Sequence, residues 1–477
     1  MNHTVRTRFA PSPTGYLHVG GIRTALFAWL VARQANGQFI LRLEDTDKNR
    51  EVAGSAEHLI ESLHALGIEY DEGPDIGGPF APYQQSSRLE LYKQWAQKLI
   101  DSGRAYADPY TPEEVQAFRE QARENKQPFL YRNHRPKNPP AWDGSQPLRF
   151  KSEPKAYEWH DEVMGDLKTG PEVIDDFILI KSDGYPTYNF CHIVDDAEME
   201  ISHVIRGQEF LSSMPNYLNL YEALGLTAPV FATMPHILNE QGNKKLGKRD
   251  GAKDVLDYIR DGYLPEALVS FIATLGWNDG TEQEVFTQAE LINKFSLDRV
   301  GKSGAHFDQK RLNWTNGHFI REMQLDDLFK SVHEYWPQSA DGSSDNYKKQ
   351  VLGLVQERMK FFAELPELTE FFFSEPEPDP SLIETNKQLK KLDKSELSTL
   401  LNQVVETLGE SNFSVEDIQK RLNNLLETTN QKPAVLFSLV RVATTWAPAS
   451  PALAESLAVL GKEKSLQRLK IAIEHIS

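Results

Sequence analysis

The hydrophobic and polar positions near the N-terminus change period twice. Residues 5–9 alternate apolar and basic side chains, which predicts a half-buried strand that ends at the prolines of residues 11–15. From Gly20 onward, apolar side chains recur at three- and four-residue steps, which predicts a helix that ends at residues 36–37 (Asn-Gly). Residues 39–43 alternate again. Strand, helix and strand in this order predict a βαβ unit, and open parallel sheets bind ligands outside the carboxyl ends of their strands.

Charged and polar side chains stand where such a ligand would bind. Arg8 lies near the end of the first predicted strand and Glu44 near the end of the next, while a loop delivers His18 and Gly20 to the N-terminus of the helix. Free N–H groups and the helix dipole favour a phosphate there. A phosphate site flanked by a cation and an anion indicates a zwitterion bound beside a nucleotide. Taken alone, the stretch is also compatible with a glycine- and proline-rich turn carrying solvated charges.

The character of the chain changes between residues 104 and 170, where prolines and arginines cluster. This predicts a subdomain inserted between two halves of a nucleotide-binding fold. Its basic surface, with the aromatic residues Phe129, Tyr131 and Trp142, is a candidate RNA-binding face. For any single arginine in this region, a solvated loop is an equally good interpretation.

The pattern predicts a return to the sheet after the insertion. Residues 173–181 are apolar enough for a buried strand, and residues 188–196 are expected to re-enter the core sheet. Asp195 and Asp196 could bind a metal, but neighbours on a strand point to opposite faces, so we favour loop capping and packing for this pair. Arg206 follows a further apolar strand, again at the edge of the sheet.

Positive charge concentrates in residues 239–253, which have no helical stripe of apolar positions. Lys244, Lys245, Lys248 and Arg249 surround Gly247. Such a run is usually a solvated loop. Placed opposite His18, it could also reach over a polyphosphate, where lysine acts as a mobile point charge.

Beyond residue 255 the pattern is helical, and the C-terminal third is predicted to be all-helical. Asp393 and Glu396 resemble a capping box that opens a helix ending at Gly409.

Composition narrows the class of protein. The chain has 477 residues, which predicts two to four domains, and no apolar run approaches the length of a membrane span. The N-terminus reaches its first strand within a few residues, so we expect no targeting peptide and a cytoplasmic protein. The single cysteine, Cys191, excludes an internal disulfide and a multi-cysteine zinc site. The net charge of −17 counts against non-specific nucleic-acid binding, although local basic patches can still bind a specific RNA.

Taken together, the motifs resemble those of glutamyl-tRNA synthetases, which are class I aminoacyl-tRNA synthetases. Residues 11–21 (PSPTGYLHVGG) are similar to the HIGH-type signature of that family, and residues 245–249 (KLGKR) to its KMSKS-type signature. Further matching segments follow in order across nearly the whole chain: residues 41–47, 183–188, 194–196, 204–207, 262–267, 275–277, 311–314 and 460–463. Each motif alone is weak evidence, but the ordered set is specific.

The resemblance implies an α/β architecture, with a Rossmann-like parallel-sheet catalytic domain, an inserted α+β subdomain and all-α C-terminal domains. The implied division is a catalytic domain in two halves (residues 1–103 and 191–255), an insertion for the tRNA acceptor end (104–190), a helical domain that contacts the tRNA stem (256–325) and an all-helical anticodon-binding domain (326–477).

The resemblance also implies a two-step reaction. The α-carboxylate of L-glutamate attacks the α-phosphate of ATP, and the glutamyl group then passes to the terminal adenosine of tRNA(Glu). His18, Lys245 and Lys248 would be catalytic; Ser12, His18, Gly20, Glu209, Leu238 and Lys248 would bind ATP; Arg8, Ala10, Ser12, Glu44, Tyr188, His192 and Arg206 would bind glutamate. Within this set Arg8 and Tyr188 would take the side-chain carboxylate, Glu44 the α-ammonium and Arg206 the α-carboxylate. Mg²⁺ would enter with ATP, and a monomer is the family expectation.

The chain departs from the family pattern in two places. Gly247 replaces the more usual serine of the second signature, which removes a hydroxyl group but keeps the lysines. Many bacterial relatives hold zinc with cysteines near Ala105, Ala107 and residues 131–135. None of these is cysteine here, and Asp108 with His134 cannot complete a tetrahedral site, so we predict no zinc and no dedicated protein metal site. The role of His192 stays open.

Three other interpretations remain to be tested. A shortened relative attaches glutamate to a modified tRNA base, but it lacks an anticodon-binding part. Glutaminyl-tRNA synthetases carry a different first signature and a β-rich C-terminal half. A catalytically retired RNA-binding paralogue is motivated by Gly247. The pattern does not decide whether tRNA(Gln) is also charged; Arg358 and Arg441 are candidates for the anticodon-facing surface.

Overall fold

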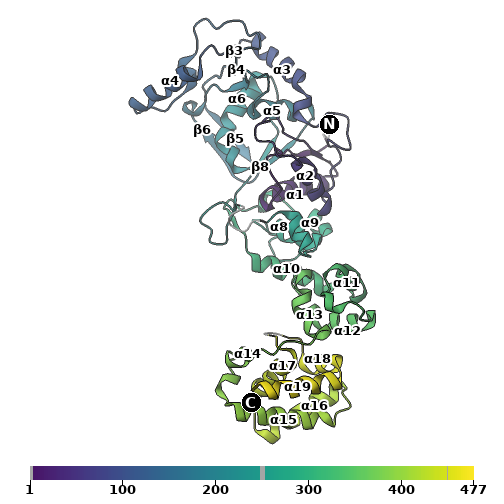
Figure 1. Cartoon of the computed structure of the whole chain (residues 1–477). Helices are drawn as coiled ribbons and strands as arrows, with labels where there is room; N and C mark the ends of the chain where they lie inside the picture. The colour runs from purple at the N-terminus through teal and green to yellow at the C-terminus, as the bar shows by residue number, and fades with distance from the viewer. Residues whose placement is uncertain (1–3, 248–252, 448–449, 477) are drawn as a thin grey trace. The chain divides into compact units, whose positions relative to one another are not determined.

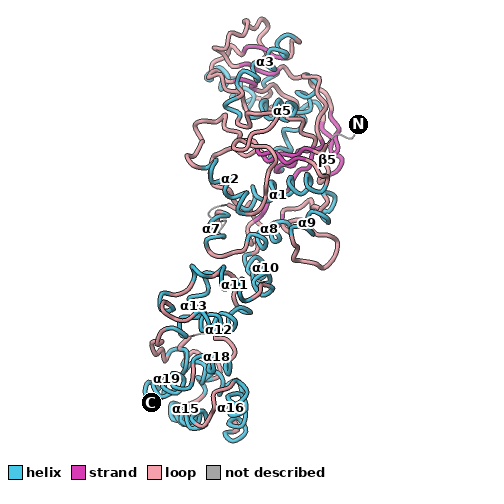
Figure 2. Tube along the Cα trace, turned by 90° about the vertical axis from the view of Figure 1, so that its right-hand side faces the viewer, coloured by secondary structure: helices cyan, strands magenta, loops and turns pink. Residues whose placement is uncertain are grey.

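The computed structural model describes residues 4–247, 253–447 and 450–476. Lys248 and Arg249 of the basic loop therefore lie outside the described residues. The chain divides into two compact units: Met1–Tyr258 with Pro265–Gln309, and Ile259–Leu264 with Lys310–Ser477. The described strands belong to the first unit, whereas the second unit is built from helices (Figures 1 and 2).

The strands of the first unit form three sheets. A six-stranded sheet has the order β2-β1-β8-β9-β5-β6, and a three-stranded sheet has the order β3-β4-β7. A two-stranded sheet pairs β10 with β11. The strand bounds are β1 (Arg6–Phe9), β2 (Gln38–Leu41), β3 (Ala105–Ala107), β4 (Leu148–Phe150), β5 (Tyr157–Asp161), β6 (Gly165–Thr169), β7 (Ile178–Ile180), β8 (His203–Gly207), β9 (Val230–Met234), β10 (Ile237–Leu238) and β11 (Ala305–His306).

The main sheet is parallel from β2 to β5, and only β6 runs antiparallel, to β5. The chain leaves β1 through a helix to reach β2 on one side, and β8 pairs with β1 on the other. The strand order thus reverses direction at β1, which is where open α/β sheets bind ligands. The expected α/β architecture with a parallel sheet and an all-helical C-terminal part is confirmed.

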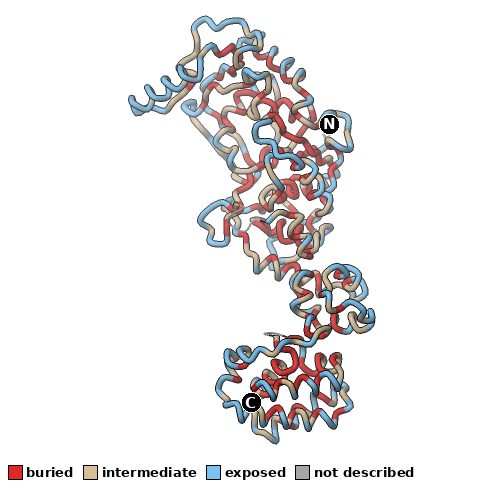
Figure 3. Tube along the Cα trace, in the orientation of Figure 1, coloured by how far each residue is buried: buried red, intermediate tan, exposed pale blue. Residues whose placement is uncertain are grey.

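Helices cover the main sheet and fill the ends of the first unit. Their bounds are α1 (Val19–Gln34), α2 (Ser55–Ala65), α3 (Leu89–Asp101), α4 (Pro112–Glu124), α5 (Tyr188–Glu198), α6 (Met214–Ala223), α7 (Val255–Arg260), α8 (Pro265–Ala273) and α9 (Gln288–Lys294). A core of aromatic and aliphatic side chains from α3, α5 and α6 packs on one face of the sheet, and α1 contacts β1, β2 and β8. No residue of α4 is buried, and Figure 3 shows it as an exposed element.

The predicted βαβ unit is present at residues 6–41. Asn36 adopts the left-handed φ of 51° after α1, as the Asn-Gly pattern predicts. Gly37 is required for a different reason, because a Cβ there would lie 2.1 Å from the carbonyl oxygen of Val5. The close approach lets the Gln38 N–H donate to that oxygen and begin the pairing of β2 with β1.

For the segment after the insertion, one expectation was wrong and a second was confirmed only over a shorter range. Residues 188–196 form most of helix α5, not a strand, and Phe190 through Asp196 are all buried. A short run that is buried on every side has no alternation to distinguish a strand from a helix. Of residues 173–181, only Ile178–Ile180 form a strand, because residues 171–173 form a turn of 3-10 helix.

The second unit consists of helices around three apolar clusters. Asp393 and Glu396 form the predicted capping box at the start of α15, which ends at Gly409. The bounds are α10 (Gln309–Glu322), α11 (Leu325–Ser331), α12 (Asp345–Val355), α13 (Leu365–Phe373), α14 (Ser381–Glu384), α15 (Lys394–Gly409), α16 (Val415–Thr429), α17 (Pro433–Thr445), α18 (Leu453–Leu460) and α19 (Lys462–Ile476).

Candidate active site

A cavity of about 890 Å³ opens at the carboxyl ends of β1, β8 and β9. It brings together residues separated by more than two hundred positions along the chain, from Arg8 to Lys245. Leu238 and His192 are not among its lining residues, and Lys248 lies outside the described part of the chain. The residues predicted from the sequence that line it are Arg8, Ala10, Ser12, His18, Gly20, Glu44, Tyr188, Arg206, Glu209 and Lys245.

The alternation of β1 decides where Arg8 points. Thr7 faces α1 and donates its hydroxyl hydrogen to the carbonyl oxygen of Ala28, so Arg8 lies on the face covered by α5. There Nε of Arg8 lies 3.1 Å from Oδ1 of Asp196, and Nη1 donates to the carbonyl oxygen of Ile205 at 3.3 Å. Arg8 is 4% exposed.

Asp195 and Asp196 are buried ion-pair partners, so the predicted role in loop capping was wrong. The helix directs the hydrogen bonds of the two carboxylates to different arginines: Asp196 accepts from Arg8 and Arg42, and Asp195 from Arg88. Nε of Arg42 also lies 3.8 Å from Oδ2 of Asp195. The charges of Arg8 and Arg42 outweigh the effect of burial and hold the pKa of Asp196 at about 2. For Asp195 burial outweighs the arginines and raises its pKa.

Arg206 on β8 is a buried cation of a different kind. It is 4% exposed and forms no ion pair with any residue in the described ranges. The guanidinium lies near the rings of Tyr217 and Phe231, with its carbon 5.1 Å from each ring centroid. Its Nη1 is buried without a hydrogen-bond partner in the described structure. A buried donor left unpaired costs stability, so this nitrogen favours an anionic ligand in the cavity.

Glu44 also lines the cavity. Its Oε1 lies 2.9 Å from Nη2 of Arg42, which is itself 0% exposed. Burial outweighs this contact and raises the pKa of Glu44 to about 7. A cation brought into the cavity would favour the ionised form of Glu44.

Tyr188 begins α5 and presents its ring to the cavity, while His192 lies one turn further on. The two rings stack at 4.6 Å, and Nδ1 of His192 lies 2.7 Å from the carbonyl oxygen of Tyr188. Burial and then Arg206 lower the pKa of His192 to about 3, which keeps the imidazole neutral. His192 therefore supports Tyr188 from behind.

The start of α1 forms another part of the cavity wall. His18 is the N-cap residue, and its carbonyl oxygen accepts from the N–H groups of Gly21 and Ile22. A Cβ on Gly21 would lie 2.6 Å from Cδ1 of Leu17, so a larger residue there would require the Leu17 side chain to move. A sixteen-residue helix with its N-terminus open to a cavity is a favourable site for phosphate.

The sequence missed one cation of this cavity, Arg23, whereas Lys245 was predicted. Arg23 lines the cavity and is held by the carbonyl oxygens of Leu275 and Pro235, and burial lowers its pKa to about 10. Lys245 lies 3.6 Å from Oε1 of Glu209, and His236 approaches the other oxygen of that carboxylate. Arg23 lies on the apolar face of α1. A charged residue among apolar helix positions was the signal in the sequence that could have indicated a buried functional group.

Comparison with known proteins gives the same family along the whole chain. The profile for class I tRNA synthetases (E and Q), catalytic domain, matches residues 4–314, and an anticodon binding domain profile matches residues 327–473. A glutamate–tRNA ligase of Clostridium botulinum is 38% identical over 498 residues, covering 100% of this chain and 99% of the relative. The chain belongs to the glutamyl-tRNA synthetase family.

Two other members of the glutamyl-tRNA synthetase family also match the whole chain. A glutamate–tRNA ligase of Dehalococcoides mccartyi is 39% identical over 485 residues, covering 100% of this chain and 99% of the relative. The crystal structure of a glutamate tRNA ligase from Elizabethkingia meningosepticum, in complex with its amino acid, superposes with a TM-score of 0.87 at 33% identity and covers 100% of both chains. The resemblance inferred from the motifs is thereby confirmed.

The region where many members of this family hold zinc is occupied by other contacts. Asp108 accepts from Tyr131 and from Arg149, and His134 stacks on Phe118 at 4.2 Å. Across the described ranges, no group of three His, Cys, Asp or Glu side chains is placed to hold a metal ion. Within the same ranges, no helix is both long enough and apolar enough to cross a membrane.

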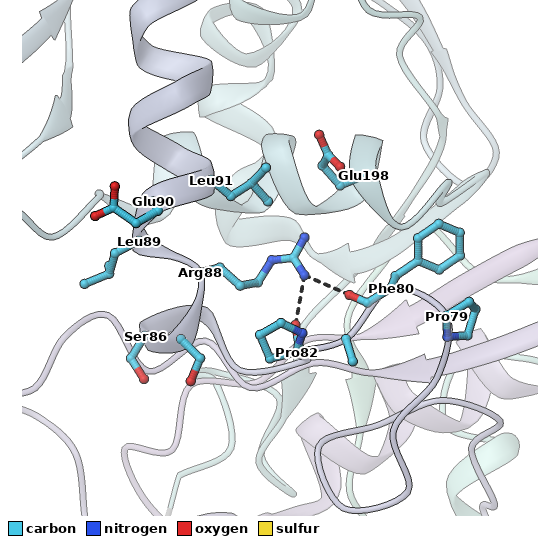
Figure 4. A pocket seen from close by; sticks show the side chains of 11 residues that line it. Pro79, Phe80, Pro82, Ser86, Arg88, Leu89, Glu90, Leu91 and Glu198 are labelled. Atoms are coloured by element: carbon cyan, nitrogen blue, oxygen red, sulfur yellow. Dashed lines mark hydrogen bonds between the residues drawn. The ribbon is translucent and has the colours of Figure 1, made fainter.

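A second cavity of about 510 Å³ lies beside the start of α3. Figure 4 shows Arg88 reaching into it, with Nη1 donating to the carbonyl oxygens of Phe80 and Pro82 at 2.9 Å. Nε of the same guanidinium donates to Asp195. Arg88 thus separates this cavity from the buried charges beneath the candidate active site.

Proposed function

We propose that this protein is an ATP-dependent glutamate–tRNA ligase that forms glutamyl adenylate and transfers the glutamyl group to the terminal adenosine of tRNA(Glu). One observation carries the proposal: two buried arginines, Arg8 and Arg206, and one buried acid, Glu44, line the same cavity. Glutamate carries two carboxylates and one ammonium group, which is the complementary set of charges.

Each substrate group has a partner of opposite charge in the proposal. Arg8 takes the side-chain carboxylate with help from Tyr188, and Arg206 takes the α-carboxylate through its unpaired Nη1. Glu44 takes the α-ammonium. Arginine suits both carboxylates because its planar guanidinium offers two parallel N–H donors.

ATP occupies the His18 end of the cavity in the proposal. An oxygen of the α-carboxylate attacks the α-phosphorus, the bond from that phosphorus to the bridging β-oxygen breaks, and pyrophosphate leaves. A carboxylate is already a nucleophile at neutral pH, so this step needs no general base. The chain contributes position and positive charge: the N-terminal N–H groups at Gly20, the imidazole of His18, and Lys245 with Lys248 on the phosphates. ATP carries the Mg²⁺.

In the second step, a ribose hydroxyl of the terminal adenosine attacks the acyl carbon, and AMP leaves with the bonding electrons of the mixed anhydride. The helical unit with the anticodon-domain match supports a full tRNA ligase over the shortened base-modifying relative. Retention of Arg8, His18 and Glu44 in one cavity supports an active enzyme over a retired RNA-binding paralogue. We further propose a cytoplasmic monomer.

Pyrophosphate exchange with glutamate, measured with and without tRNA, tests this function. We expect exchange that requires tRNA. Absence of exchange under both conditions would rule out the enzyme, and exchange without any need for tRNA would favour the base-modifying relative. Charging of purified tRNA(Glu) and tRNA(Gln) side by side then distinguishes a discriminating ligase from one that also charges tRNA(Gln), and glutamine as amino acid tests the glutaminyl alternative.

The role of Lys248 is tested by Lys248→Ala. We expect adenylate formation to slow by a factor that corresponds to about 3–4 kcal/mol, with glutamate binding little changed, because the lysine acts on charge that builds up in the transition state. Equal losses in rate and in glutamate binding would indicate a structural role instead.

A further inference from the structure

Asp196 is the common acceptor for two buried arginines from neighbouring strands. Its Oδ1 lies 3.1 Å from Nε of Arg8 and 2.7 Å from Nη1 of Arg42, and its Oδ2 lies 3.4 Å from Nη2 of Arg8. The three side chains are almost completely buried, with Arg42 at 0% and Asp196 at 2% exposure. Such a contact holds the Arg8 guanidinium in one rotation, because the carboxylate binds it along one edge at two nitrogens.

This arrangement leaves a defined part of Arg8 for a ligand. The guanidinium has five N–H donors, of which Nε and one on each terminal nitrogen are used by Asp196 and Ile205. One N–H therefore remains on Nη1 and one on Nη2 without a described acceptor. Arg8 lines the cavity, so these two donors are available to a carboxylate bound there.

Arg42 connects the two sides of the glutamate site. Its Nη1 donates to Asp196, which holds Arg8, and its Nη2 donates to Glu44 at 2.9 Å. One buried guanidinium thus places both the cation that would take the side-chain carboxylate and the anion that would take the ammonium. Arg42 does not line the cavity itself.

We propose that Asp196 and Arg42 are positioning residues that set the affinity for the acidic side chain of the amino-acid substrate by fixing Arg8 and Glu44 from beneath the cavity. The proposal rests on the proposed function, because it assigns glutamate to this cavity. It adds a buried layer of residues that do not touch the substrate.

The charge balance of the buried cluster supports this assignment. With all three carboxylates ionised, the cluster holds four guanidinium groups and three carboxylates, which leaves one positive charge in excess without a ligand. Glutamate carries one net negative charge at neutral pH. Binding therefore neutralises a cluster that is shielded from water, where the attraction between charges is strong. The cluster consists of Arg8, Arg42, Arg88, Arg206, Glu44, Asp195 and Asp196.

Asp195 provides a matched control one residue away on the same helix. It is 0% exposed and accepts from Arg88, Tyr92 and Gln85, each at 2.8 Å. Its Oδ2 also lies 3.8 Å from Nε of Arg42, which donates no hydrogen bond to it. Arg88 lines the second cavity, as Figure 4 shows, and neither Arg88 nor Tyr92 lines the active-site cavity. Asp195→Asn and Asp196→Asn each remove one negative charge from the same helix, but only Asp196 holds Arg8.

The test is pyrophosphate exchange in the full-length enzyme with tRNA present, comparing Asp196→Asn, Asp195→Asn and Asp196→Glu. For Asp196→Asn we expect the KM for glutamate to rise by about 10- to 100-fold, as for a displaced binding group, with the KM for ATP unchanged. For Asp195→Asn we expect a lower melting temperature but a KM for glutamate within about threefold of wild type. Asp196→Glu keeps the charge and should recover part of the affinity.

Each result decides the matter. If Asp196 has a purely structural role, Asp196→Asn will lower the active fraction of the enzyme, and with it kcat, while the KM values for glutamate and ATP stay unchanged. That outcome would overturn the proposal. Equal rises in the KM for glutamate for Asp195→Asn and Asp196→Asn would overturn it as well. If Asp196→Asn fails to fold, Arg42→Lys replaces it, since lysine keeps the charge but cannot bind Asp196 and Glu44 together; a normal KM for glutamate would then count against the proposal. Absence of exchange in the wild type would instead refute the proposed function.

Discussion

Oε1 of Glu44 lies 2.9 Å from Nη2 of Arg42, while Oε2 accepts no hydrogen bond from any described residue. The side chain lines the cavity and is 4% exposed, and the described residues donate hydrogen bonds to only one of its two carboxylate oxygens. Burial therefore raises the pKa of Glu44 to about 7 from its ordinary value of 4.5.

This raised pKa predicts a pH dependence of glutamate binding. In the proposed binding mode the α-ammonium of glutamate needs the ionised form of Glu44, which increases as the pH rises through about 7. We expect the affinity for glutamate to rise by about tenfold between roughly pH 6 and pH 8, since one pH unit below the pKa leaves about a tenth of the group ionised. Glu44→Gln should bind weakly at every pH. Calorimetric titration across this range checks it, and a pH-independent wild type would contradict it.

The raised pKa of Glu44 has the opposite effect on folding stability: stability falls as the pH rises, whereas the affinity for glutamate is expected to increase. A carboxyl group whose folded pKa is above its unfolded value contributes stability below the unfolded pKa, and the contribution is lost as the pH rises through the folded pKa. The window for Glu44 therefore runs from 4.5 to about 7. We expect Glu44→Gln to gain stability relative to wild type as the pH rises across this window, measured by urea unfolding without ligand. A constant difference between the two proteins would show that Glu44 does not titrate there.

Replacing Arg206 and replacing Arg8 are expected to have different effects on the melting temperature. Arg206 has no acidic partner in the described structure, whereas Arg8 compensates Asp196. Arg206→Met should abolish glutamate-dependent exchange yet leave the melting temperature unchanged or higher, because the protein no longer buries an unpaired cation. Arg8→Met should lower the melting temperature by several degrees, because Asp196 loses one of its two cations. Thermal unfolding of both variants checks this, and an equal decrease would mean that Arg206 has an acidic partner.

The N-terminal half of the site was predictable because its secondary-structure periods are unambiguous. Residues 5–43 change from a period of two to a helical period and back, so the sequence places Arg8, His18 and Glu44 at one edge of a parallel sheet. The structure has them lining one cavity. Their individual substrate contacts remain predictions.

The buried charge layer was not predictable from the pattern. Arg42 and Asp196 are separated by 154 positions, and nothing local to either indicates the other. Helix α5 was also assigned as a strand, which turned Asp195 and Asp196 to opposite faces. A charged residue inside an apolar run was the one available signal, because arginine and aspartate are rarely buried without a partner.

Replacing Arg468 is expected to lower the stability of the second unit alone. It lies on α19, is 2% exposed, and donates to the carbonyl oxygens of Phe371, Thr444 and Ser374 as well as to Glu375. Arg468→Met leaves three carbonyl groups without this donor, which should cost about 2–4 kcal/mol. Scanning calorimetry should show a lower unfolding temperature for the second unit, and the KM for glutamate should stay normal. A shifted KM for glutamate with unchanged unfolding would contradict a structural role.

Arg441 on α17 is the residue of the second unit whose surroundings best fit an RNA ligand. Its Nε is buried without a hydrogen-bond partner in the described structure. Burial lowers the pKa of Arg441, and the positive charge of the exposed Arg358 lowers it further. Two arginines that repel each other beside an unused donor favour a phosphate or a base edge between them.

We therefore expect Arg441→Gln to raise the KM for tRNA by about tenfold, with the KM values for glutamate and ATP unchanged, since one nucleic-acid contact contributes about 1–3 kcal/mol. Arg421→Gln is the matched control: Arg421 lies on the neighbouring helix α16 and is paired with Asp417 at 2.9 Å. Its KM for tRNA should stay close to wild type, because that guanidinium is already compensated within the protein. Equal increases for both variants would mean that the helical unit attracts tRNA through its overall charge, and a normal KM for Arg441→Gln would remove Arg441 from the tRNA-binding surface.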